Sequence, residues 1–156
     1  ATWLADVDIP GIYFLLDIER HGTDQAALIA ERELFDLAGI AGVRRVQILI
    51  GPVQLAAVQV RAAGQNSGSC EGVLRKTRAD QARITSANMA RLAEMAVEAG
   101  LLLYLEALFG PPLNRPFDQQ ALIARANRPN LKIVVDFWHR FASVIGQRVS
   151  LPYRAN

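Results

Sequence analysis

The stretch from Lys132 to His139 reads Lys-Ile-Val-Val-Asp-Phe-Trp-His, and it constrains the fold more than any other part of the chain. An apolar run without polar alternation is typical of a strand buried on both faces, as in a parallel sheet covered by helices. Ligands bind such folds at the carboxyl ends of the strands. We therefore expect Asp136 and His139, which follow the run, to lie where a ligand binds.

Similar strands alternate with helical segments along the chain. The predicted strands are 12–18, 44–50, 101–105 and the run from Lys132, and the predicted helices are 25–38, 53–63, 79–99 and 117–127. Strand-helix alternation implies βαβ units and a parallel sheet. The sequence thus predicts an α/β fold, either part of a (β/α)8 TIM barrel or a small doubly wound sheet. No Gly-x-Gly-x-x-Gly motif or P-loop is present, which disfavours nucleotide binding.

Two of the predicted helices have a clear carboxyl end, and one of them also has a clear apolar face. Glycines are expected to end them, Gly39 after 25–38 and Gly100 after 79–99. The helical spacing in 79–99 predicts one apolar face. Its members are Ile84, Ala87, Leu92, Met95, Ala96 and Ala99.

Composition fits a single domain over residues 1–156, because 51% of the residues are hydrophobic and 21% are charged. The net charge of +2 comes without a run of basic residues, so we expect no nucleic-acid partner. No segment reaches the roughly 18 apolar residues of a membrane span. The single Cys70 favours a reducing, cytoplasmic location. The polar stretch 64–77 is predicted to be a flexible loop, either a lid or a surface insertion.

Glu106 and Asp136 each end a predicted strand and are separated by one strand-helix unit. Their strands are therefore expected to be neighbours, about 4.8 Å apart. Two carboxylates at that distance repel each other unless a proton or cation lies between them. Their oxygens suit Mg²⁺ or Mn²⁺, and Zn²⁺ is an option where histidine is near. Alternatively, either acid caps the next helix or pairs with Arg115 or Arg140.

The residues around this pair suggest a substrate pocket. His139 could be a ligand, a substrate hydrogen-bonding group or an acid/base, or it could be structural. Trp138 could stack on a sugar ring, whereas Phe137 is expected in the core. Glu19 and His21 end the first strand and could face the same mouth.

Several segments together resemble the xylose isomerase-like TIM barrel superfamily, in particular its sugar phosphate isomerase/epimerase branch. The matching segments are 93–100, 103–108 and 128–139, with 16–19 and 44–52 similar to preceding strands. The resemblance covers about residues 12–140. The Leu-Glu-x-Leu and Asp-x-x-His pieces, which contain Glu106 and Asp136, carry it through their order and spacing.

The resemblance implies an activity. Glu106 is similar to the fifth-strand metal ligand, which in many members also exchanges a substrate proton, and Asp136 to the sixth-strand ligand. His139 is similar to the substrate-binding histidine. The implied enzyme is a sugar isomerase or epimerase of carbohydrate metabolism. It would use Mn²⁺, Mg²⁺, Co²⁺ or Zn²⁺ and an enediolate to move a proton next to the carbonyl of a sugar or polyol ketone.

The chain departs from this family in length and in ligands. A full barrel has about 250 residues, and the family's further histidine and glutamate ligands have no counterpart after His139. The chain thus resembles a partial barrel, which a second copy could complete in a homo-oligomer. One alternative is an incomplete or degenerate barrel that acts as a non-catalytic binding or assembly module. An apurinic endonuclease-like metal-dependent hydrolase ranks lower, because the only histidines are His21 and His139.

Overall fold

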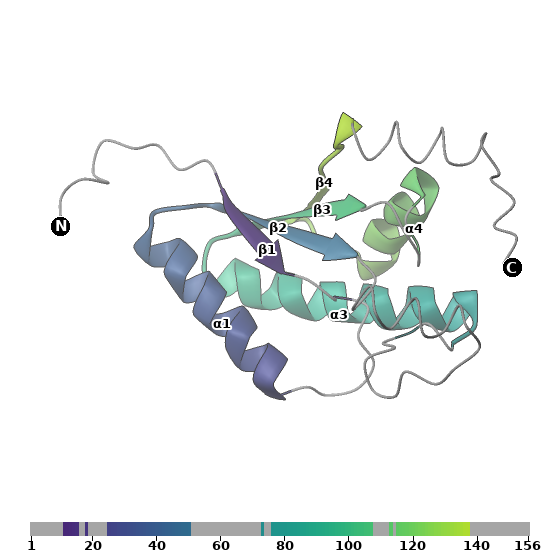
Figure 1. The fold of residues 1–156 in the computed structure, drawn as a ribbon, viewed down its shortest axis with the longest axis horizontal. Helices are drawn as coiled ribbons and strands as arrows, with labels where there is room; N and C mark the ends of the chain where they lie inside the picture. Colours follow the sequence, from purple (N-terminus) through teal and green to yellow (C-terminus); the bar gives the residue numbers. More distant parts are fainter. Residues whose placement is uncertain are drawn as a thin grey trace, which may run out of the picture.

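The strands of this protein form one parallel sheet in which the spatial order follows the chain. The computed structural model describes residues 11–15, 18, 25–50, 73, 76–107, 113 and 115–137. The strands are β1 (Ile12–Leu15), β2 (Arg45–Ile50), β3 (Leu102–Ala107) and β4 (Leu131–Ile133). Each strand pairs in parallel with the next, in the order β1-β2-β3-β4 (Figure 1). The predicted parallel sheet is confirmed.

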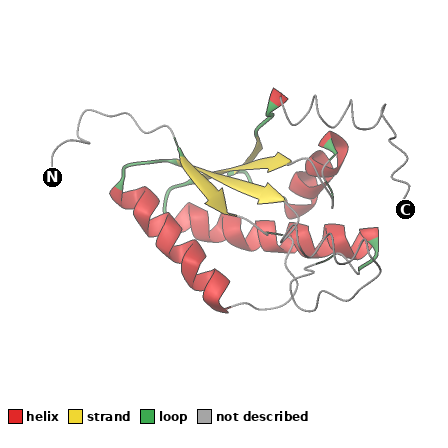
Figure 2. Cartoon of the chain, in the orientation of Figure 1, coloured by secondary structure: helices red, strands yellow, loops and turns green. Residues whose placement is uncertain are grey.

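In the part of the chain that the structure describes, three helices cover one face of this sheet: α1 (Gln25–Ile40), α3 (Arg78–Glu98) and α4 (Pro116–Ala126) (Figure 2). The register partners Ile48 and Leu105 belong to one buried cluster that includes residues of all three helices. Sequential strands with helices on one face are the arrangement of a (β/α)8 barrel, whereas a doubly wound sheet has helices on both faces. The described residues therefore form a partial TIM barrel and not a doubly wound sheet.

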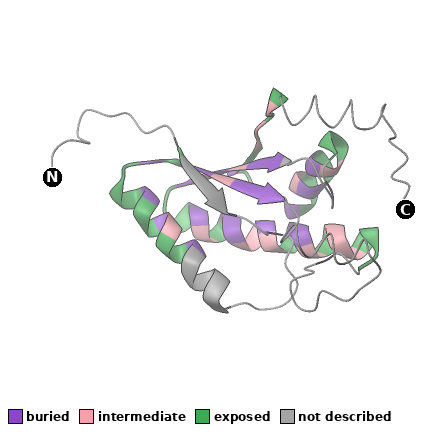
Figure 3. Cartoon of the chain, viewed as in Figure 1, coloured by how far each residue is buried: buried purple, intermediate pink, exposed green. Residues whose placement is uncertain are grey.

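Half of the side chains in the central strands lie on the face of the sheet opposite the helices. In β2 and β3, the helix-facing residues alternate with residues on the opposite face. The opposite set includes Gln47, Leu49, Tyr104 and Glu106, and Leu49 is paired in register with Glu106. Figure 3 shows buried residues along β2 and β3 and exposed residues on the outer surfaces of the helices. The face opposite the helices is therefore where the barrel interior would lie.

The strand β4 is shorter and more exposed than the sequence predicts. It ends at Ile133, Lys132 is exposed, and Val135 is 50% exposed. The expectation of a strand buried on both faces is therefore wrong here. Among the described residues β4 pairs only with β3, so it forms an edge of the sheet, and an edge strand buries less than a central one.

The buried face of α3 is rotated from the predicted one. Ala87 and Ala99 are exposed, whereas Leu92 and Ala96 are buried as expected. The full buried set is Thr85, Ser86, Met89, Leu92, Ala93 and Ala96. Part of the reason is that Ser86 satisfies its hydroxyl locally, donating to the Arg83 carbonyl at 3.1 Å, so a polar side chain can face the core.

The helix ends follow capping chemistry. Thr77 caps α3, since its hydroxyl accepts from the backbone N–H of Asp80 at 3.1 Å. Hydrogen bonds from Thr77 and from Arg83 lower the pKa of the Asp80 carboxyl. The helix α1 continues through Gly39 to Ile40, and Gly42, with φ of 69°, makes the turn instead.

A buried amide joins three elements at the amino-terminal end of the strands. The Asn130 side chain, just before β4, donates to the carbonyl of Ala93 in α3 at 2.9 Å. It also donates to the carbonyl of Leu101, just before β3, at 3.3 Å. This position is only 7% exposed, so the bonds form in a largely water-free environment.

An ion pair joins α1 to α3. Arg91 donates to both carboxylate oxygens of Glu31, at 2.8 and 3.2 Å. The Glu31 side chain is 1% exposed, and that of Arg91 is 34% exposed. Partial burial lowers the pKa of Arg91. A buried carboxylate depends on such a partner for its charge.

Other predictions fall on the rest of the chain. The helix expected at 53–63 and most of the loop expected at 64–77 lie outside the described residues. Among the helices that the structure does describe, none combines the length and the apolar character needed to cross a bilayer.

We predict that Leu92→Ala lowers the free energy of unfolding by about 2–5 kcal/mol, because Leu92 is fully buried between α3 and the sheet. The matched control is Val97→Ala in the same helix. Val97 is 57% exposed, so its truncation should cost less than about 0.5 kcal/mol. Urea denaturation measures both, and equal losses would contradict the placement of the core.

We also predict that Arg91→Met lowers the free energy of unfolding by roughly 2–4 kcal/mol, because it leaves the buried Glu31 carboxylate without this cation. In the control Arg83→Met, an exposed pair with Asp80 is removed from the same helix, and no measurable loss is expected. Should thermal and urea denaturation give the two variants the same stability, the pair would not be important for docking α1.

Candidate functional site

The carboxylate of Glu106 lies near the carboxyl end of β3 and is only 3% exposed. Its neighbour Leu105 points into the core, so alternation places Glu106 on the face opposite the helices. Burying a carboxylate is costly unless it has hydrogen-bond or charge partners. Glu106 therefore requires partners within the protein. It lies near the carboxyl end of its strand, which is where TIM-barrel enzymes have their active sites.

One partner of this carboxylate comes from the neighbouring strand. The Gln47 side-chain amide donates to Oε2 of Glu106. The register aligns Gln47 with Tyr104, so the amide reaches two residues further toward the carboxyl end of β3. The sequence patterns do not indicate this contact. The available signal was one uncharged polar residue within the apolar run Val46–Ile50.

The second predicted acid, Asp136, follows β4 by three residues. The chain still runs beside β3 at Val134, whose N–H donates to the Leu105 carbonyl at 2.9 Å. Asp136 itself is half-buried. The expectation that β3 and β4 are neighbours is confirmed, so both acids belong to adjacent strand ends.

The remaining predicted site residues, Trp138, His139, Glu19 and His21, lie outside the described residues. Ile18, directly before Glu19, is described and buried, and its carbonyl accepts from the Asn88 side chain at 2.8 Å.

The prediction that Phe137 belongs to the core is wrong, because this ring is 81% exposed. Val135, two residues earlier, is also 50% exposed, so this segment packs less closely than the strand before it.

The described part of the chain contains no group of three or more His, Cys, Asp or Glu side chains that could hold a metal ion. Glu106 and Asp136 would supply two carboxylate ligands, both hard oxygen donors. A further histidine, cysteine or acidic ligand would come from residues beyond the described ranges or from another chain.

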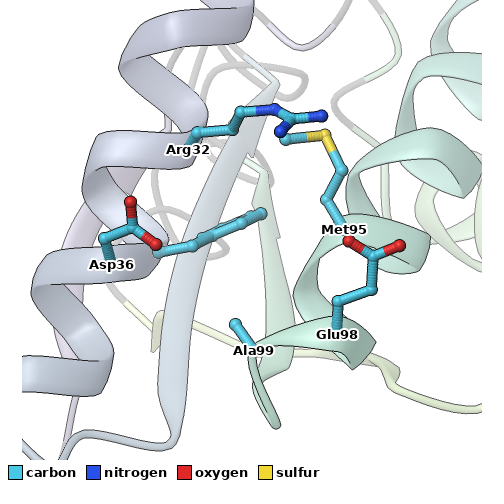
Figure 4. Close-up of a pocket in the computed structure, with 6 residues that line it drawn as sticks. Arg32, Asp36, Met95, Glu98 and Ala99 are labelled. Carbon is cyan, nitrogen blue, oxygen red and sulfur yellow. The ribbon is translucent and has the colours of Figure 1, made fainter.

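A separate cleft of about 220 Å³ lies between α1 and α3, on the helical side of the sheet. Arg32 and Asp36 of α1 and Met95 and Glu98 of α3 line it (Figure 4). It opens near the carboxyl ends of these helices, which is the end of a barrel associated with stability rather than catalysis. We therefore assign the candidate site to the strand ends and not to this cleft.

Comparison with known proteins supports the fold. The sequence matches no family model, and a search of curated proteins finds no match. Among solved structures, the chain is similar to a xylose isomerase-like TIM barrel/4-hydroxyphenylpyruvate dioxygenase fusion protein. The TM-score is 0.64 at 22% identity, over 86% of this chain and 19% of that one.

A D-allulose 3-epimerase from Methylomonas sp. also matches, with a TM-score of 0.49 at 19% identity, over 80% of this chain and 40% of that one. The chain thus spans about a fifth of the fusion protein and two fifths of the epimerase. The likeness to the fusion protein supports the fold that the sequence predicts, a partial TIM barrel.

Proposed function

We propose that this chain forms part of a divalent-metal-dependent isomerase or epimerase that moves a proton next to the carbonyl of a sugar or polyol ketone. The observation that carries the proposal is the buried Glu106 carboxylate, near the carboxyl end of a parallel barrel strand and on the face opposite the helices. The position of Asp136 after the adjacent strand supports it. The single cysteine is in keeping with a cytoplasmic location, which we also propose.

The donor set fits a divalent metal ion in its chemistry. Glu106 and Asp136 are carboxylates, which suit Mg²⁺ and Mn²⁺, and a nitrogen ligand such as His139 would extend the choice to Co²⁺ or Zn²⁺. When bound, the ion would supply Lewis acidity that polarises the substrate carbonyl.

The chain's own residues would carry the proton. In this proposal, one oxygen of Glu106 accepts the proton from the carbon next to the carbonyl, and the acid returns it to the adjacent carbon, which isomerises the substrate. Epimerisation would require a second acid on the opposite face of the substrate to return a proton to the same carbon. A base must lie within hydrogen-bond reach of that proton, and the rigid strand holds the carboxylate better than a loop would. Burial of Glu106 keeps bulk water from this exchange. His139 and Trp138 are proposed to bind the substrate, with Glu19 and His21 at the same mouth.

We predict that Mn²⁺ at about one hundred times its Kd stabilises the protein by roughly 2.7 kcal/mol, which raises Tm by about 5–10 °C. Glu106→Gln should abolish most of this rise and remove turnover of any substrate found, because the amide is a weaker metal ligand and a poor base. Thermal denaturation with and without Mn²⁺ measures the shift.

The matched control is Glu98→Gln, which removes an exposed carboxylate near the end of α3. It should keep the full Mn²⁺ response. If wild-type protein shows no response to Mn²⁺, Mg²⁺, Co²⁺ or Zn²⁺, the alternative of a non-catalytic binding or assembly module becomes the better description. If Glu106→Gln responds as wild type does, the site lies elsewhere.

A further inference from the structure

The most unusual residue of the central strand β2 is Gln47. It is flanked by Val46 and Ile48, both fully buried, and the strand continues with buried apolar residues to Ile50. Its own position is half-buried. A polar side chain in such a strand loses hydration on folding and requires a protein partner. The partner that the structure provides is the Glu106 carboxylate.

The chemistry of the two groups determines the direction of the bond. An ionised carboxylate only accepts hydrogen bonds, so the amide must present its NH₂ group to Glu106. Both side chains project from the same face of adjacent, in-register strands, so the contact needs no loop to hold it. The bond therefore fixes the orientation of the carboxylate plane relative to the sheet.

The amide also leaves the charge of the carboxylate in place. An Arg or Lys at this position would act as a counter-ion and would compete with a bound cation. A neutral donor orients the acid and preserves its negative charge, which is the typical behaviour of the hydrogen-bonding groups behind metal-ligating side chains.

We propose that Gln47 is a positioning residue that orients Glu106 for the binding of a divalent cation. This inference rests on the proposed function, since it assigns Glu106 as a metal ligand. It adds a residue on a different strand, and this residue acts through Glu106 without contacting the substrate.

The first test needs no metal. The side-chain amide resonances of Gln47 in ¹⁵N NMR spectra should shift when Glu106→Leu removes the acceptor. They should be almost unchanged by Tyr104→Phe, which removes a hydroxyl from the same face at the register partner of Gln47. Amide resonances that do not respond to Glu106→Leu would overturn the inference, whatever the metal experiments give.

The second test measures Mn²⁺ affinity of the full chain by calorimetry. Gln47→Leu, similar in size but without a donor, should weaken binding about ten- to a hundredfold, the usual effect of losing a hydrogen-bond partner of a ligand. Gln47→Asn keeps the amide on a shorter side chain and should fall between wild type and Gln47→Leu. Tyr104→Phe should bind as wild type does.

The outcomes separate the two proposals. Equal Mn²⁺ affinity in wild type and Gln47→Leu would overturn the positioning role and leave the proposed metal site standing. If wild type binds no divalent ion, the proposed function fails, and with it the role of Gln47 toward a cation. Circular dichroism of each variant would show whether it is folded, and Gln47→Asn replaces Gln47→Leu if the apolar variant is not.

Discussion

The structure depends on a single apolar layer between the sheet and its helices. Alternate residues of the central strands, such as Ile48 in β2 and Leu105 in β3, lie on the helix side of the sheet and pack in one cluster with residues of α1, α3 and α4. Because strand side chains alternate, that layer also determines which residues face the other way. Gln47, Tyr104 and Glu106 are on the opposite face for this reason. The hydrophobic core and the candidate site are therefore two consequences of one alternation.

The pair formed by Gln47 and Glu106 is difficult to explain by stability alone. Polar groups in a barrel interior lose hydration, and bulky apolar residues usually fill those positions. Proteins commonly retain such groups at functional sites at some expense of stability. Our proposal gives the pair a use: Glu106 supplies charge and a base, and Gln47 orients it. The buried acid Glu31 differs from Glu106, because Glu31 is paired with the cation Arg91 and this pair joins two helices. We regard that ion pair as structural.

The sequence predicts elements better than faces and edges. The helix α3 begins and ends within one residue of its predicted bounds, since its caps are strong local signals. Its buried face differs from the predicted one in part because Ser86 satisfies its hydroxyl within the helix, which hydropathy does not reveal. The order of strands and helices along the sequence correctly predicts that the strands preceding Glu106 and Asp136 are neighbours. The exposure of Val135 depends on how many strands flank β4, and the partner of Gln47 depends on register; neither is encoded locally.

The buried Asn130 amide has a consequence for how this scaffold tolerates change. It ties the end of α3, the start of β3 and the turn before β4 at one end of the sheet. The candidate site occupies the opposite end. Because this tie lies at the opposite end of the sheet from the candidate site, changes in the segments that follow the strands would leave it in place. A scaffold divided in this way can acquire a new substrate preference by loop replacement without rebuilding its core.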